Sequence, residues 1–276
     1  MLQKITVKIP ATTANLGPGF DCLGMALDIW NTVQVEVGGS TFEVRGEGQG
    51  KLPEGPSNLV YRSFRIPFLV KGENVPQVNI RCENEIPLAR GLGSSSAAVI
   101  GGLLAGNKLG GQLLSDDELL KLAVETEGHP DNATPALLGG MQVAVQNGDR
   151  VITSAVPLPQ NLRAVVLIPD VPISTTESRA ELPSSVTMKD AVFNLSRVAL
   201  LVSALSSGNL NQLGVATEDR LHQRSRQRMF PAMKTIFTAA MDAGALGVFL
   251  SGAGSSILAL TRGREMSIGY EMAEAA

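Results

Sequence analysis

Residues 86–98 read I-P-L-A-R-G-L-G-S-S-S-A-A, and they join the end of a predicted strand to the start of an apolar helix. Gly91 and Gly93 have no Cβ, so the backbone here can adopt positive φ and approach a ligand closely. Ser94–Ser96 follow at the predicted helix entry, where free N–H groups point outward at the positive end of the helix dipole. Together these features predict a site for a phosphate-sized anion.

The stretch differs from the common nucleotide-binding motifs. No Lys follows Gly93 as G-x-x-x-x-G-K-[ST] requires, and the spacing is not that of G-x-G-x-x-G. A Gly/Ser turn that merely caps a helix would explain the letters G-L-G-S, but not the full string. The thirteen residues resemble the phosphate loop of the GHMP kinases, which include galactokinases, homoserine kinases and mevalonate kinases. The resemblance implies that ATP is bound by Pro87, Leu88, Ala89, Arg90, Gly91, Leu92, Gly93, Ser94, Ser95, Ser96 and Ala97.

Composition limits the class of protein. Of the 276 residues, 44% are hydrophobic and 18% are charged, which is typical of a globular chain with one large or two ordinary domains. A net charge of −3 provides no basic surface for nucleic acid. Two cysteines in a chain of this size indicate no disulfide framework, so we expect a reducing, cytoplasmic compartment. Two histidines cannot form a His-rich metal site, whereas an oxygen-ligated Mg²⁺ stays possible.

Residues 243–260 carry no charged side chain and approach the length of a membrane span. They contain four glycines and three serines, gathered around the stretch 251–256. Two short buried strands joined by a turn explain this composition better than a helix, so we expect no membrane segment.

Hydrophobic periodicity predicts a mixture of strands and helices without a regular βαβ repeat, hence an α+β fold. Alternation at Ile5, Val7 and Ile9 predicts a first strand that ends at Pro10, followed by a polar loop over 11–21. A turn is expected at 129–132, and a soft domain boundary near 153 separates domains 1–153 and 154–276. Further strands are expected near 33–37, 42–44, 78–82, 141–145, 163–168, 246–250 and 257–260, and helices near 58–69, 97–109, 190–206 and 231–243, with another between the Ser115 capping box and Gly128.

Three further stretches extend the resemblance, which then runs from about residue 3 to 262. A-T-T-A-N-L-G-P-G-F-D-C-L-G (11–24) and H-P-D-N (129–132) are similar to motifs of the homoserine kinase branch, and S-G-A-G-S-S (251–256) resembles a third GHMP motif, with Ser255 where Pro is usual. The resemblance implies a two-domain GHMP kinase fold, with an N-terminal ATP-binding domain of the ribosomal-protein-S5-like type and a C-terminal ferredoxin-like α/β sandwich. It also implies transfer of phosphate from ATP to the L-homoserine hydroxyl, on the route to threonine, by a homodimer.

Homoserine carries an ammonium, a carboxylate and a primary hydroxyl, so its pocket should offer a carboxylate, arginines and a polar side chain. The resemblance assigns Asp21 and Asn15 to the amino group and hydroxyl end, and Asn132 to the hydroxyl. It assigns Arg179 and Arg226 to the α-carboxylate, a role that suits paired guanidinium forks. Asn132, Arg179 and Arg226 are the residues expected to be catalytic, although Arg224 and Arg228 could be confused with Arg226.

Magnesium should bridge the β- and γ-phosphates of ATP. The resemblance points to Ser95 and Glu127 as its ligands, with Ser94 and Glu125 as rivals, and to Asn58 as a contact near adenine. No residue is an obvious base, and Asp131 is the nearest carboxylate. We therefore expect catalysis by positioning and charge stabilisation.

Two alternatives stay open at this point. One is a GHMP kinase for another small alcohol such as mevalonate, for which the carboxylate of Asp21 would have no partner. The other is a degenerate GHMP fold that binds without catalysis. The sequence stops at 276 within a predicted helix, so the second domain is expected to lack the last strand that the family has.

Overall fold

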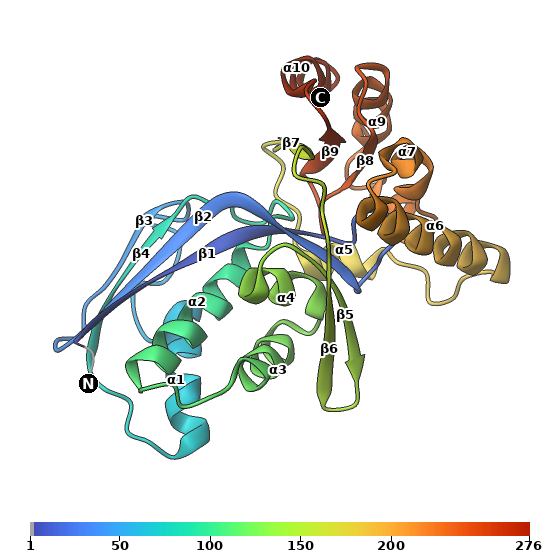
Figure 1. Cartoon of the computed structure of the whole chain (residues 1–276). Helices are drawn as coiled ribbons and strands as arrows, with labels where there is room; N and C mark the ends of the chain where they lie inside the picture. Colours follow the sequence, from blue (N-terminus) through green and yellow to red (C-terminus); the bar gives the residue numbers. More distant parts are fainter. Residues whose placement is uncertain (1–2) are drawn as a thin grey trace.

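The computed structural model describes residues 3–276 and contains two sheets with helices packed against them (Figure 1). The larger sheet has six strands, and the smaller has three. The larger sheet comprises β1 (Lys4–Ala14), β2 (Leu23–Val37), β3 (Phe42–Gly46), β4 (Val78–Asn84), β5 (Met141–Asn147) and β6 (Arg150–Val156).

Strand β2 organises the larger sheet. It pairs antiparallel with β1 along almost its whole length, with β4 through residues 32–37 and with β5 through residues 23–25. β3 lies parallel to β4, and β5 and β6 form an antiparallel hairpin. Because β2 reaches from one end of the sheet to the other, it holds β4, which leads into the phosphate loop, and β5, which follows α4, in one frame.

The predicted end of the first strand at Pro10 is wrong. β1 continues to Ala14, and the pairing with β2 shifts register between Pro10 and Ala11. Proline has no N–H to donate and is tolerated in sheets at such irregularities, so it bends the strand instead of ending it. The first residues of the expected polar loop, up to Ala14, are therefore strand.

Four helices cover one face of the larger sheet (Figure 1). They are α1 (Leu59–Lys71), α2 (Ser94–Leu109), α3 (Asp116–Glu127) and α4 (Pro130–Leu138). The predicted capping box at Ser115 and Glu118 is present, and Gly128 ends α3 in the left-handed region. The expected turn at 129–132 is wrong: Pro130 occupies the first turn of α4, where its missing N–H costs no hydrogen bond.

Helices α1 and α2 approach each other at two glycines one helical turn apart. A Cβ at Gly102 would collide with the Val60 carbonyl, and a Cβ at Gly106 with the Phe64 carbonyl. Phe64 is fully buried beside these glycines. The small residues of α2 thus allow the close packing that secures the helix that begins at the phosphate loop.

The rest of the chain forms the smaller sheet and the helices near it. The strand order of this sheet is β7-β9-β8, and neighbouring strands are antiparallel. The strands predicted near 246–250 and 257–260 are confirmed, whereas β7 is less buried than its apolar sequence indicated. The elements are β7 (Arg163–Leu167), α5 (Thr175–Ala180), α6 (Met188–Ser207), a 3-10 turn (Leu210–Gln212), α7 (Leu213–Ala216), α8 (Gln223–Arg226), α9 (Met233–Asp242), β8 (Gly247–Leu250), β9 (Ile257–Thr261) and α10 (Glu265–Glu274).

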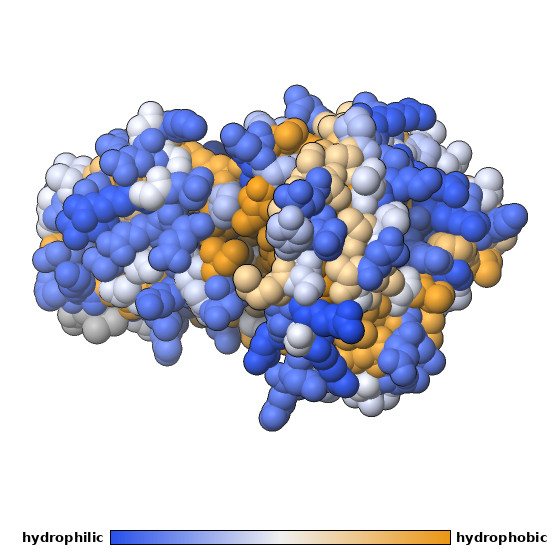
Figure 2. Space-filling model, turned by 90° about the horizontal axis from the view of Figure 1, so that it is seen from above, coloured by the Kyte–Doolittle hydropathy of each residue, from blue (hydrophilic) through white to orange (hydrophobic). Residues whose placement is uncertain are grey.

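Seen from above, most of the surface is hydrophilic, and hydrophobic residues gather mainly in the hollow between its two parts and at the lower right (Figure 2). Within residues 3–276, no helix has the length and apolar character needed to cross a membrane. The domain boundary near residue 153 falls inside β6 and stays a prediction.

Alanine at Gly106 should destabilise the protein because its methyl group would push α2 away from the backbone of α1. We expect Gly106→Ala to lower the free energy of unfolding by about 1–3 kcal/mol, as overpacking does. Gly269→Ala is a matched control in the helix α10, where the added Cβ meets only Val165 Cγ1 at 3.6 Å. The control should be neutral or stabilising by up to about 1 kcal/mol, given the helix propensities of the two residues. Equal denaturation midpoints for both variants would contradict the close-packing explanation.

Candidate active site

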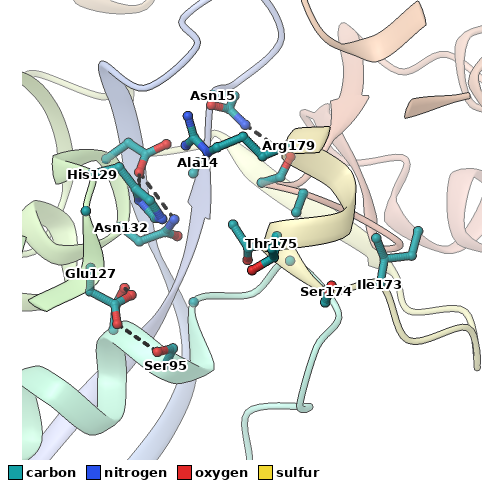
Figure 3. A pocket seen from close by; sticks show the side chains of 18 of the residues that line it. Ala14, Asn15, Ser95, Glu127, His129, Asn132, Ile173, Ser174, Thr175 and Arg179 are labelled. Carbon is teal, nitrogen blue, oxygen red and sulfur yellow. Dashed lines mark hydrogen bonds and ion pairs between the residues drawn. The ribbon is translucent and has the colours of Figure 1, made fainter. Parts of the chain in front are cut away.

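A cavity of about 890 Å³ lies where the larger sheet, its helices and the second part of the chain meet (Figure 3). Its walls are the end of β1, the phosphate loop, the start of α2, the junction of α3 and α4, and the segment that begins α5. In Figure 3, Ser95 and Glu127 lie at the lower end of the view, while Asn15 and Arg179 lie at the upper end. The cavity therefore has two chemically different ends.

The phosphate loop forms the lower end. Gly91 and Gly93 have φ of +72° and +69°, in the left-handed region that favours glycine. A Cβ at Gly93 would overlap Thr12 Oγ1, and one at Gly91 would overlap the Ser251 carbonyl. Gly93 is the residue that precedes α2, so the first N–H groups of this helix are not capped by its side chain. These N–H groups suit a phosphate, as the sequence predicted.

Oxygen ligands collect beside these N–H groups. Ser95 Oγ donates to Glu127 Oε1 at 2.7 Å, and Ser96 Oγ donates to Glu127 Oε2. Glu127 is the last residue of α3, where its charge opposes the helix dipole. One carboxylate with neighbouring hydroxyls is a donor set that fits Mg²⁺, which keeps several waters and is bound together with substrate phosphates.

The upper end carries opposite charges. Asp21 and Arg179 form a two-pronged ion pair, with both N–O distances at 2.8 Å. This pairing raises the pKa of Arg179. Arg226 is 3% exposed, and burial lowers the pKa of its guanidinium to about 10. It therefore remains a cation at neutral pH, and its Nε has no hydrogen-bond partner among residues 3–276.

The loop after β1 presents this end in a strained conformation. Asn15, Leu16 and Asp21 have φ of +69°, +46° and +55°, which residues other than glycine rarely adopt. The Asn15 side chain accepts from the Asp21 N–H and donates to the Gly252 carbonyl. The Phe20 ring lies 5.3 Å from Arg179 Cζ and 5.5 Å from Arg226 Cζ. The loop thus brings a carboxylate, an amide and an aromatic face to the two arginines.

Polar side chains from α4 and β1 lie between the two ends. Thr12 Oγ1 donates to Asn132 Oδ1 at 2.8 Å, and Asn132 Nδ2 lies 3.4 Å from Asp131 Oδ1. His129 Nδ1 is 2.7 Å from the same Asp131 oxygen. This bond is the main reason that the pKa of His129 is raised, against the effect of burial. The imidazole of His129, held by Asp131, therefore lines the middle of the cavity.

Most of the predicted site residues meet in this cavity, and five do not line it. Asn58 is buried as the N-cap of α1, where it accepts from Val60 N and donates to the Pro53 carbonyl. Arg90 points the other way, to the Pro169 carbonyl and Asp170. The residues that line it as predicted are Asn15, Asp21, Ala89, Gly91, Leu92, Gly93, Ser94, Ser95, Ser96, Glu127, Asn132, Arg179 and Arg226, and those that do not are Asn58, Pro87, Leu88, Arg90 and Ala97.

Sequence reasoning missed the wall formed by Ser174, Thr175 and Thr176. Ser174 caps α5 by accepting from Glu177 N, and the helix places Arg179 one turn further on. Three consecutive hydroxyl residues shortly before a predicted ligand arginine were a usable signal. Thr12 was also missed, because the strand was expected to end at Pro10.

Comparisons with known proteins agree with this geometry. Residues 58–140 match the GHMP kinases N terminal domain, and residues 201–273 match the GHMP kinases C terminal model. The homoserine kinase of Moorella thermoacetica is 45% identical over 270 residues, which cover 98% of this chain and 91% of the relative. That of Synechocystis is 44% identical over 265 residues, which cover 94% and 86% of the two chains.

Solved structures give the same result. The crystal structure of homoserine kinase from Cytophaga hutchinsonii superposes with a TM-score of 0.90 at 32% identity and covers 100% of this chain and 91% of its own. Leishmania major mevalonate kinase shares the fold at a TM-score of 0.73, with 17% identity, covering 99% of this chain and 92% of its own. The expected two-domain GHMP kinase fold is thereby confirmed. The chain belongs to the homoserine kinase family of the GHMP kinases.

Proposed function

We propose that this chain transfers the γ-phosphoryl group of ATP to the side-chain hydroxyl of L-homoserine. The observation that carries the proposal is one continuous cavity with an anion-binding helix start at one end and paired opposite charges at the other. ATP fits the first end, because Gly91–Gly93 bring backbone N–H groups close to a phosphate. A small zwitterion fits the second. Function as a homodimer stays a prediction from the family resemblance.

The charged end explains how an amino acid would be held. Asp21 receives the substrate ammonium, and Arg179 and Arg226 receive the α-carboxylate. Asp21 and Arg179 pair with each other, so a substrate that replaces this ion pair must bring both an ammonium and a carboxylate. A monoanion such as mevalonate would take Arg179 and leave the Asp21 carboxylate without a cation, which argues against a carboxylate-only substrate.

Ser95 and Glu127 would hold Mg²⁺ together with the phosphates of ATP, while the α2 N–H groups contact the transferred phosphoryl group. When bound, the cation would neutralise the charge that develops on the phosphate oxygens. Glu127 is kept in place by two serine hydroxyls, so the chain presents its carboxylate without rearrangement.

Asn132 orients the substrate hydroxyl from the middle of the cavity, and Thr12 holds the Asn132 side chain. Asp131 is 3% exposed and already engaged by His129 and Asn132. An early proton transfer is not required for a loose phosphoryl transfer, so positioning carries most of the rate. The degenerate, non-catalytic alternative is disfavoured because the phosphate loop, Glu127 and Asn132 all line one cavity.

Turnover should require both charged groups of the substrate. We expect Mg·ATP-dependent ADP release with L-homoserine, and kcat/KM at least about a hundredfold lower for 4-hydroxybutyrate, which lacks the ammonium, and for 3-amino-1-propanol, which lacks the carboxylate. Losing one partner of a charged pair costs several kcal/mol, which is more than the free energy that corresponds to a hundredfold change in kcat/KM. Equal turnover of mevalonate, or no turnover of any alcohol, would refute the assignment.

Alanine at Gly93 should abolish phosphate binding in a folded protein. The new methyl group must occupy a left-handed position and overlap Thr12, so the N–H groups of the loop are displaced. We expect kcat/KM for ATP to fall at least about a hundredfold, the cost of losing a preorganised donor. Gly72→Ala is the matched control, with the same φ of +69° but nothing within 4 Å of the added Cβ. Its ATP kinetics should match the wild type.

Asn at position 131 tests for a base. Asp131→Asn keeps an oxygen that can accept from His129, but it cannot take a proton. Because we expect positioning to dominate, kcat should fall by less than about a thousandfold, whereas the loss of a general base can cost up to about ten-thousandfold. A larger fall in kcat, with KM for homoserine unchanged, would identify Asp131 as a base.

A further inference from the structure

His222 connects three parts of the substrate end without reaching the cavity itself. Its side chain is fully buried between the loop after β1 and the start of α8. Its Nε2 lies 2.7 Å from the Gly17 carbonyl oxygen, and its Nδ1 lies 2.9 Å from Arg226 Nη1. The Phe20 ring is tilted against the imidazole, with 5.3 Å between the ring centroids.

These two contacts fix the protonation state of the imidazole. A carbonyl oxygen can only accept, so Nε2 must carry a proton and donate to Gly17. A guanidinium can only donate, so Nδ1 must keep its lone pair and accept from Arg226. Both bonds exist together only in the neutral tautomer with hydrogen on Nε2.

We propose that His222 is a positioning residue that, as a neutral imidazole, aims the Arg226 guanidinium at the substrate carboxylate. The inference rests on the proposed function, which assigns the carboxylate to Arg226. Arg226 Nη1 donates to both His222 Nδ1 and the Gly252 carbonyl at 2.9 and 2.8 Å. With Nη1 held from two sides, the donors left for the carboxylate are the N–H groups of Nη2 and the Nε–H, which lacks a partner among residues 3–276.

Protonation of His222 would undo this arrangement. The new Nδ1–H would face an Arg226 N–H, placing two donors and two positive charges together. Burial lowers the pKa of His222, and the charge of Arg226 lowers it further, while Asp219, Asp21 and the bond to Gly17 oppose this. The Asp219 carboxylate is 3.8 Å from Nε2.

Asp219 does not accept from the imidazole, because its oxygens are already used. They accept from the N–H groups of Leu221, His222 and Gln223 and from Asn194 Nδ2. His222 is therefore neutral above its ordinary pKa of 6.5 and becomes charged only as the pH falls through a lower value in the folded protein. We therefore expect His222 to leave homoserine binding through Arg226 unchanged above pH 6.5 and to weaken it as the pH falls below that value.

Two amide variants test the His222–Arg226 and His222–Gly17 hydrogen bonds one at a time. His222→Asn places a carbonyl oxygen near the position of Nδ1 and can still accept from Arg226. His222→Gln places an N–H near the position of Nε2 and can still donate to Gly17. We expect the Gln variant to raise KM for L-homoserine at least tenfold at pH 7.5 with KM for ATP within twofold of the wild type. The Asn variant should raise KM for homoserine by less than a third of that factor.

The pH profile distinguishes positioning from mere packing. In the wild type, KM for homoserine should stay constant down to pH 6.5 and rise as the pH falls further, and this rise should be smaller in His222→Asn, which cannot titrate. Thr217→Val removes a buried hydroxyl that donates to the Leu213 carbonyl nearby and controls for general destabilisation. It should lower the melting temperature and leave KM for homoserine unchanged. The inference would be overturned by equal KM increases in both His222 variants. It would also be overturned if KM for homoserine rose at low pH as much in the Asn variant as in the wild type.

A measurement on the unmodified protein covers the case in which the variants do not fold. The chain has two histidines, so their imidazole ¹⁵N shifts can be assigned from the contact of His129 with Asp131. The Nε2–H tautomer of His222 at pH 7.5 is expected, and the Nδ1–H tautomer or an imidazolium would refute the inference. If the wild type fails to phosphorylate homoserine, the proposed function fails, whereas the tautomer test still stands by itself.

Discussion

The geometry of the whole cavity depends on how the carbonyl oxygens of the phosphate loop are occupied. Leu92 O accepts from Thr12 N, Ala89 O from Ile173 N and Arg90 O from Ser256 N, and Ser251 Oγ donates to Gly91 O. These donors come from β1, from the segment before α5 and from the turn between β8 and β9. Because the carbonyls are bound on the outside by three distant segments, the N–H groups at the start of α2 are left facing the cavity.

The turn 251–256 couples this loop to the substrate end. Its Gly252 carbonyl accepts from both Asn15 Nδ2 and Arg226 Nη1, while its Ser251 hydroxyl binds the phosphate loop. A shift of this turn would therefore move the site for the phosphate and the site for the carboxylate together. Catalysis by positioning requires such a common support, since an error of about 1 Å between reacting groups can cost a hundredfold in rate.

The sequence predicted those features whose cause is local. The capping box at Ser115, the glycine turn before Ser94 and the strands around residues 251–256 follow from residue types within a few positions. The failures have long-range causes. Pro10 stays in a strand because β2 tolerates a register shift opposite it. The tautomer of His222 depends on Gly17, which is 205 residues away.

The distribution of charge supports the proposal that a metal ion and backbone N–H groups together bind the phosphates of ATP. Among residues 3–276, the arginines that line the cavity are Arg179 and Arg226, and both belong to the end that would hold the amino acid. The phosphate end instead carries Glu127, whose negative charge would repel ATP. A carboxylate in that position is favourable only when a cation lies between it and the phosphates. If Mg²⁺ binds here as proposed, the same Glu127 that opposes a bare nucleotide would make the site selective for a nucleotide that arrives with its metal.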